Sequence, residues 1–484
     1  MTIKQSLKSP QTLFERFCSC KYLIVLCSVL LLWQSIYYIL FPNPGADGPI
    51  YLSHTFSVIQ GHPFKNLFLQ EYIHTFNFPY LYGFFNAPFY FLFKNTNFQI
   101  YSIFFWNIIW IVLFLYGSSL TLKNDKSYFL KFSLLSIAYL VSVYTNTLRS
   151  ETFILPFFIL LQYFFYRAFQ SRERIFKFLY APLLLAIIGL MHPVAGVYGC
   201  IFALLYAIEN NQSVSVIFIF FFVCVFYIAV LYLPVVFIDV DSWKLNFIQR
   251  GFIERTHSLI DISVFLKYVS LNPLIIFLAL MCILNAESIF KEITFWLIIY
   301  FTIAYFHQSY YFHYLFSFAL WRLSRVSSFR VPVLFKIGFI IIVLYSMSIT
   351  YFLRIFQIAE NYNYAKTFKQ ILHYLENSED ETESKKVWVP GEIAMPILAK
   401  SNTRLHWSFI ANYKGIMQPI DSTSIFYLDD LHQLDYIKQY SFVKNTNLKV
   451  QEIIAPVKGL LTISREGKRS DSLGLWEVKV LPGN

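Results

Sequence analysis

Long apolar runs recur through the first 354 residues of the chain, and few charged residues interrupt them. Each run is close to the roughly 20 residues that a helix needs to cross about 30 Å of hydrocarbon. The pattern predicts an all-α polytopic membrane bundle over residues 1–354, with about eleven transmembrane helices. The expected spans are 22–41, 100–120, 132–146, 152–166, 178–191, 194–208, 214–238, 264–284, 293–306, a helix that follows His313 and ends near Arg322, and 333–353.

Lysine and arginine indicate which loops face the cytoplasm, because short loops rich in these residues stay on that side. Four of them precede the first span, so the N-terminus is predicted to be cytoplasmic. The stretch 42–99 has no net positive charge and is predicted to be the first outer loop, with short helices lying on the membrane surface. A span over 80–93 is rejected, because it would place the lysines that follow residue 122 on the outer face.

The last part of the chain, 355–484, differs in pattern and predicts a soluble α/β domain. Residues 360–376 have helical periodicity, and short β-rich runs occur at 387–389, 460–464 and 475–481. With an odd number of spans before it, this domain is expected to be extracytoplasmic. The chain is therefore predicted to be an integral protein of the bacterial inner membrane.

Composition supports this division. Hydrophobic residues make up 57% of the chain and charged residues only 14%. Residues 355–484 carry 15 basic and 15 acidic residues, so the whole net charge of +11 belongs to the membrane part. The positive-inside rule accounts for that placement, and no nucleic-acid partner is expected. The chain also lacks a Walker A sequence, which argues against ATP-driven transport.

Asp47, just after the first predicted span, is the first candidate for chemistry. A carboxylate there can act as a general base towards an acceptor hydroxyl, with a pKa tuned by partial burial. The alternative is that Asp47 caps a helix over about 48–60, since Asp before Gly-Pro is a good N-cap. Both roles can hold together.

Arginines in the outer loops are candidates for binding phosphate. Arg149 and Glu151 open a predicted span, and the Arg149 guanidinium suits the oxygens of a lipid phosphate. Its alternative role is an interfacial anchor paired with Glu151. Arg250 and Arg255 are second candidates for a phosphate leaving group, with attraction to anionic lipid headgroups as their alternative.

Two histidine-containing segments complete the outer candidates. His192 precedes Pro193 between two short spans, so it is expected either to face a cavity or to make a helix-end hydrogen bond. The segment 307–313 includes His307, Tyr310 and His313, and suits a sugar ring or a polyprenyl phosphate, although an aromatic belt explains it as well. The spacing of its two histidines gives no strong metal signature.

Taken in order, these features resemble the GT-C superfamily of membrane glycosyltransferases, which includes dolichyl-phosphate-mannose protein mannosyltransferases and bacterial aminoarabinose transferases. The resemblance rests on the spans, an acid at the start of the first outer loop, a Leu-Arg-x-Glu span start, a His-Pro-x-x-Gly break and a C-terminal extracytoplasmic domain. It implies that Asp47 is the catalytic base. Many members carry a second acid beside the first, whereas Ala46 and Gly48 flank Asp47 here. No cofactor is therefore assigned, and a divalent cation stays open.

The resemblance implies transfer of a sugar from a polyprenyl-phosphate donor to a glycan, lipid or protein acceptor, with inversion of the anomeric centre. Membrane lipids are the remaining expected partners. Two other classes stay open. A polysaccharide polymerase or ligase also handles lipid-linked sugars, but typically has a very large central outer loop. A non-catalytic lipid or polysaccharide transporter would place ionisable residues near the middle of the bilayer.

Overall fold

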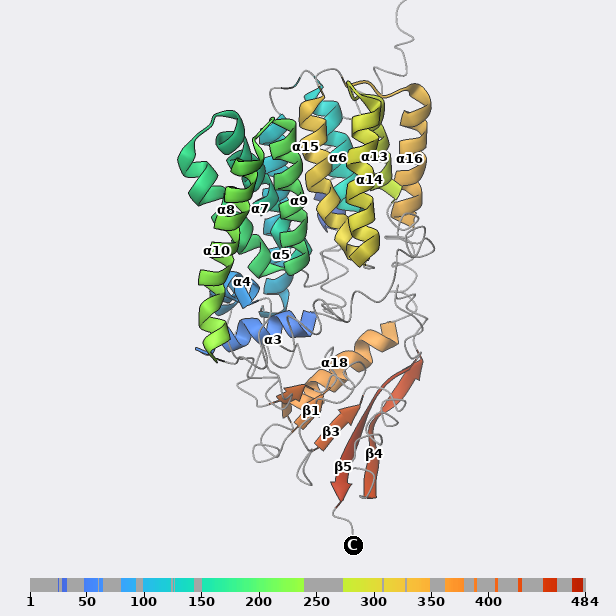
Figure 1. Cartoon of the computed structure of the whole chain (residues 1–484). Helices are drawn as coiled ribbons and strands as arrows, with labels where there is room; N and C mark the ends of the chain where they lie inside the picture. The colour runs from blue at the N-terminus through green and yellow to red at the C-terminus, as the bar shows by residue number, and fades with distance from the viewer. Residues whose placement is uncertain are drawn as a thin grey trace, which may run out of the picture.

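The structure is a computed structural model, and it consists of a bundle of helices and a small C-terminal sheet (Figure 1). It describes residues 25, 28–32, 48–59, 61–63, 80–92, 99–122, 125, 127–142, 150–238, 273–306, 309–326, 329–348, 362–377, 387–389, 405–407, 425–428, 447–458 and 472–481.

The bundle consists of α-helices whose order follows the predicted spans. They are α5 (Gln99–Leu122), α6 (Tyr128–Ser142), α7 (Ser150–Phe165), α8 (Ala181–Met191), α9 (Pro193–Glu209), α10 (Val214–Ile238), α13 (Pro273–Leu284), α14 (Ile289–Phe306), α15 (Leu315–Arg325) and α16 (Val333–Met347). Two short π-helical segments, η2 (Tyr166–Gln170) and η3 (Phe176–Tyr180), lie between α7 and α8. A 3-10 segment, η5 (Ser309–Tyr314), precedes α15.

Three stretches of the described helices are long and apolar enough to cross a membrane: Phe105–Leu122, Phe153–Gln170 and Val214–Leu233. Five more apolar helices are 10–17 residues long. These findings indicate membrane association, and the number of eleven spans stays a prediction.

Helix α6 begins four residues before its predicted start at 132, and a cap explains the shift. The carboxylate of Asp125 accepts a hydrogen bond from the backbone N–H of Ser127 at 2.7 Å, and the carbonyl of Asp125 accepts one from the N–H of Tyr128 at 3.0 Å. The cap extends the helix to include Lys131, which the apolar pattern had left outside the span.

Two helices from the predicted outer loop lie across one end of the bundle (Figure 1). They are α3 (Gly48–Ile59) and α4 (Tyr80–Leu92). Tyr82 of α4 packs edge-on against Phe153 of α7, with ring centres 5.4 Å apart. The expectation of short helices in 42–99 is therefore confirmed.

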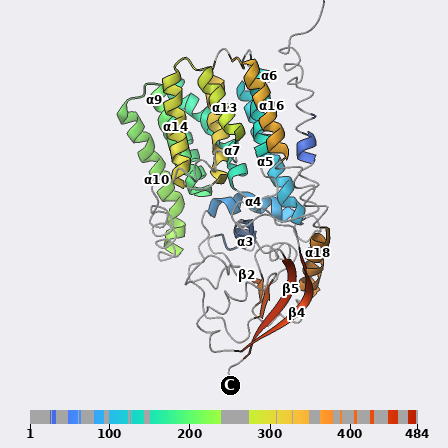
Figure 2. The same cartoon turned by 90° about the vertical axis from the view of Figure 1, so that its right-hand side faces the viewer.

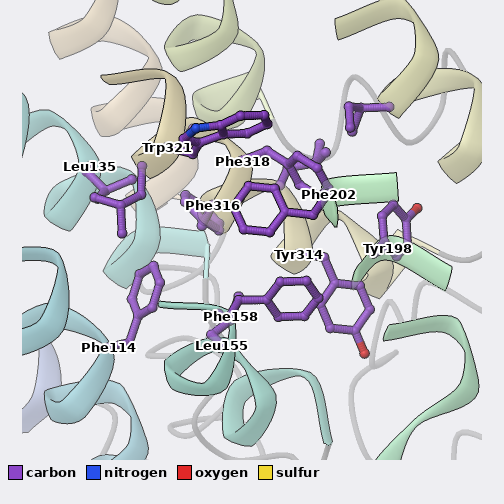
Figure 3. Close-up of a cluster of buried hydrophobic side chains, with 14 of the residues drawn as sticks. Phe114, Leu135, Leu155, Phe158, Tyr198, Phe202, Tyr314, Phe316, Phe318 and Trp321 are labelled. Carbon is purple, nitrogen blue, oxygen red and sulfur yellow. The ribbon is translucent and has the colours of Figure 1, made fainter. Parts of the chain in front are cut away.

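Aromatic side chains fill the interior between α7, α9 and α15 (Figure 3). Trp321 lies edge-on to Phe202 at 4.7 Å and stacks on Tyr206 at 5.3 Å, centre to centre. Nearer the α3 end, Tyr314 packs against Phe158 and Tyr198. This packing fixes α15 and the segment before it against α7 and α9.

Helices α8 and α9 approach closely through glycines. A Cβ atom added at Gly196 would lie 2.7 Å from the Cα of Gly189, which is backbone and cannot turn aside. A Cβ at Gly199 would lie 2.4 Å from Leu185 Cδ1. The two helices therefore form a tight hairpin around His192 and Pro193, the break that the sequence predicted.

The C-terminal part consists of α18 (Tyr362–Asn377) and a five-stranded sheet in the order β2-β1-β3-β5-β4. The strands are β1 (Val387–Val389), β2 (Leu405–Trp407), β3 (Ile425–Leu428), β4 (Asn447–Lys458) and β5 (Ser472–Leu481). Strands β2, β1 and β3 are parallel, whereas β5 pairs antiparallel with β3 and β4. The predicted helix, β1 and β5 are confirmed, but β2, β3 and β4 were missed, and 460–464 lies outside the described residues. Figure 2 shows the sheet beyond α3 and α4.

Candidate functional site

The bundle has two chemically different ends. We call the end that contains the α7–α8 connection and the first turns of α6, α14 and α16 the charged end. The opposite end, next to α3, contains the α8–α9 break and η5, and we call it the histidine end. Within residues 25–348, every Lys, Arg, Asp and Glu side chain that the structure describes lies at the charged end. The described histidines of the same range, His54, His62, His192 and His313, belong to the histidine end.

Arg322 joins three helices at the charged end. Its Nε donates to both carboxylate oxygens of Glu292 at 3.0 and 2.9 Å, and its Nη1 donates to Glu209. The indole N–H of Trp296 donates to Glu292 at 3.0 Å. The Glu292 side chain is only 3% exposed, and these donors satisfy its carboxylate oxygens inside the protein.

Lys131 joins a second set of elements at the charged end. Its ammonium donates to Asp125 and to the carbonyl of Val326, and it lies 5.7 Å from the centre of the Phe329 ring. Its side chain is fully buried. Burying an ammonium is costly unless it is paired, so this contact fixes the start of α6 beside the end of α15. The hydrophobic pattern left Lys131 outside the predicted span 132–146, so sequence reasoning missed this role.

His192 is buried at the histidine end and caps α9. Its Nδ1 accepts a hydrogen bond from the backbone N–H of Ala195 at 3.4 Å. The helix-end hydrogen bond, one of the two expectations for His192, is therefore confirmed. Its burial, at 7% exposure, places it inside the protein.

The hydroxyl of Tyr314 lies 3.2 Å from the same Nδ1. Because a backbone N–H can only donate, Nδ1 of His192 must be an acceptor, and the Tyr314 hydroxyl then donates to it. The imidazole is consequently neutral and carries its proton on Nε2, which makes it a hydrogen-bond donor. Sequence reasoning missed Tyr314, which is one residue past the predicted aromatic segment.

His313 is also buried, with Nε2 3.2 Å from the carbonyl oxygen of Ser142 at the end of α6. The expectation that the 307–313 segment suits a sugar ring or a polyprenyl phosphate, or forms an aromatic belt, stays a prediction. In the structure, η5 turns the His313 side chain inward, where it meets a carbonyl that the end of α6 leaves unbonded. His313 therefore joins η5 to α6.

His54 of α3 packs against the backbone of α4. A Cβ at Gly83 would lie 2.8 Å from the imidazole ring, and the Nε2 of His54 lies 3.3 Å from the carbonyl oxygen of Pro63. Burial lowers the pKa of His54 to about 4, with the Pro63 contact opposing the shift. The ring is neutral at physiological pH and stabilises the α3–α4 pair by packing.

The remaining predicted residues are only partly within the described structure. Asp47, Arg149, Arg250, Arg255 and His307 lie outside the described residues. Glu151 and Tyr310 belong to the described backbone of α7 and η5, and their side chains lie outside the described part. In the chain, α3 begins directly after Asp47 and α7 directly after Arg149.

The described residues include no group of three or more His, Cys, Asp or Glu side chains that could hold a metal ion. No family model matches the chain, and comparisons with curated proteins and with solved structures give no match either.

Proposed function

We propose that this protein is a membrane glycosyltransferase of the GT-C type, which transfers a sugar from a polyprenyl-phosphate donor to a glycan, lipid or protein acceptor. One observation carries the proposal. The helix starts that follow Asp47 and Arg149, the His192 break and η5 all belong to the histidine end of the bundle. Described segments that are distant in the sequence thus meet at one end, which supports an active site at the membrane surface.

The proposed reaction is a single displacement. Asp47 takes the proton of the acceptor hydroxyl as its oxygen attacks the anomeric carbon, and the bond from that carbon to the donor phosphate breaks. Arg149, with Arg250 or Arg255, stabilises the departing lipid phosphate, because fixed cations match the charge that develops there. Attack from the face opposite the leaving group inverts the anomeric centre.

His192 contributes a neutral donor in this proposal. Its Nδ1 accepts hydrogen bonds from Ala195 and Tyr314, so this nitrogen does not serve as the base. Its Nε2–H suits a sugar hydroxyl or a phosphate oxygen. Tyr314 is a positioning residue, since it acts on the substrate only through the His192 ring.

The histidine end, together with the C-terminal domain, is proposed to face out of the cytoplasm. The support is the distribution of charge, since the cations that the structure describes in the bundle lie at the other end, where the positive-inside rule places them. Donor and acceptor would then meet at the outer leaflet.

The experiment compares wild type with Asp47→Asn for incorporation of labelled sugar from native polyprenyl-phosphate donors into membrane glycans. We expect the variant to lose transfer while keeping its yield and melting temperature. Glu287→Gln is the matched control, because it makes the same acid-to-amide change at an exposed position of the charged end. Transfer by Asp47→Asn at the rate of the control would reject the proposed base.

A further inference from the structure

The connection between α7 and α8, residues 166–180, is an ordered basic hairpin. The backbone N–H of Ser171 donates to the Tyr166 carbonyl at 3.1 Å, and that of Glu173 donates to the Arg167 carbonyl at 3.0 Å. Arg172, between them, has a φ of 57°, in the left-handed region that residues other than glycine rarely adopt. The chain therefore places an arginine at a strained position at the tip of the turn.

The basic hairpin, residues 166–180, contains one acidic residue and four cations, and one of these cations forms an ion pair with the acid. Arg167 donates through Nη2 to Glu173 at 2.7 Å, and its guanidinium lies 4.8 Å from the centre of the Phe176 ring. The other three cations, Arg172, Arg174 and Lys177, form no ion pair with any residue in the described part of the chain. The hairpin therefore holds an excess of positive charge that has no counterion among the described residues.

The basic hairpin lies where lipid headgroups are expected. The apolar stretch Phe153–Gln170 ends two residues before Arg172. Apolar side chains on the same hairpin remain uncovered, with Tyr166 49%, Ile175 51% and Tyr180 40% exposed. Aromatic residues beside cations are typical of the membrane interface, where the ring lies among acyl chains and the charge among headgroups.

From these observations we propose that the basic hairpin binds the headgroup of an anionic phospholipid in the leaflet at the charged end. The phosphate would lie between Arg172, Arg174 and Lys177, which supply donors for its oxygens and relieve their mutual repulsion. A lipid fits better than an acidic protein segment, because the uncovered apolar side chains adjoin the cations. This binding is separate from the proposed sugar transfer, which uses the opposite end.

The test is lipid retention, measured by native mass spectrometry of the full chain titrated with phosphatidylglycerol or with phosphatidylcholine. We expect wild type to prefer phosphatidylglycerol, and Arg174→Gln with Lys177→Gln to weaken that binding about 25-fold, since each interfacial cation contributes about fivefold. Lys291→Gln, an exposed cation at the charged end outside the hairpin, should leave binding unchanged.

Arg172→Gly separates binding from folding. Glycine adopts a positive φ without strain, so the variant should melt at or above the wild-type temperature while binding phosphatidylglycerol about fivefold more weakly. Equal binding of the two lipids by wild type would overturn the proposal. So would a loss of binding in Lys291→Gln as large as in the hairpin variants, because it would show general attraction rather than a site.

Discussion

The charged end and the histidine end of the bundle treat polar groups in opposite ways. At the charged end, buried carboxylates and cations pair directly, as Arg322 does with Glu292 and Lys131 with Asp125. At the histidine end, the structure describes no Lys, Arg, Asp or Glu side chain, and the hydrogen bonds of His192 and His313 reach helix-end backbone groups or Tyr314. Ion pairs therefore hold helices together at the charged end. At the histidine end, charged groups for catalysis must come from the segments that flank its helices.

Among the substitutions considered, replacement of Arg322 should lower the free energy of unfolding most. Arg322→Met would leave Glu292 and Glu209 without their cation, and we expect a loss of about 3–5 kcal/mol in the free energy of unfolding. Unfolding in mixed micelles measures it. Replacing Glu292 by Met in the same chain should recover part of the loss, because two apolar side chains need no partner. A single variant as stable as wild type would show that the cluster does not hold α9, α14 and α15 together.

Acid should affect the histidine end first, through His54. The pKa of this ring falls from 6.5 to about 4 on folding. Between these pH values, the unfolded chain binds a proton at His54 that the folded chain does not bind. Stability is then fully present above pH 6.5 and decreases as the pH falls towards 4, by about 3 kcal/mol at about 1.4 kcal/mol per pKa unit.

Melting temperatures across this pH range in wild type, His54→Gln and His62→Gln measure the effect. His62 is exposed, so its replacement should leave the acid sensitivity unchanged. Replacing His54 should remove most of that sensitivity. An identical pH profile in the His54 variant would mean that another group is responsible.

The α8–α9 hairpin that presents His192 should not tolerate a methyl group at Gly196. Its Cβ would lie 2.7 Å from the backbone of Gly189, and we expect Gly196→Ala to cost about 1–3 kcal/mol. Gly338 of α16 is the matched control, because a Cβ there meets nothing within 4 Å. Gly338→Ala should be neutral or slightly stabilising. Equal melting temperatures for the two variants would contradict the close approach of α8 and α9.

The two roles assigned to His192 can be separated by substitution. Asn places an oxygen near the position of Nδ1 and is a good N-cap, so His192→Asn should keep the fold but lose the Nε2–H donor. His192→Ala should lose about 1 kcal/mol of stability through the missing cap. We expect sugar transfer to decrease in both variants, and the melting temperature to decrease only in His192→Ala. Full transfer by His192→Asn would show that the ring is a cap alone.

Much of the helical order could be predicted from hydrophobic pattern. The bounds of α10 agree with the predicted span because a run of 25 residues, in which Ser215 interrupts the apolar pattern, lies between polar neighbours. The hydrophobic pattern placed the start of α6 less well, because a lysine at position 131 is typical of a loop. Its partners are Asp125, which is nearby, and Val326, which is far along the chain, and only the fold shows that they pair with it. The same limit applies at the candidate site. The His192-Pro193 break was visible, whereas Tyr314 is 122 residues away and became its partner only through folding.

The sidedness of the two ends is tested most directly by labelling single cysteines in intact cells with an impermeant thiol reagent, starting from a chain whose native cysteines are replaced. His62→Cys at the histidine end and Ser171→Cys at the tip of the basic hairpin are both exposed positions. We expect the first to react from outside and the second only after the membrane is opened. Reaction of Ser171→Cys in intact cells, with His62→Cys protected, would reverse the orientation and contradict sugar transfer at the outer leaflet.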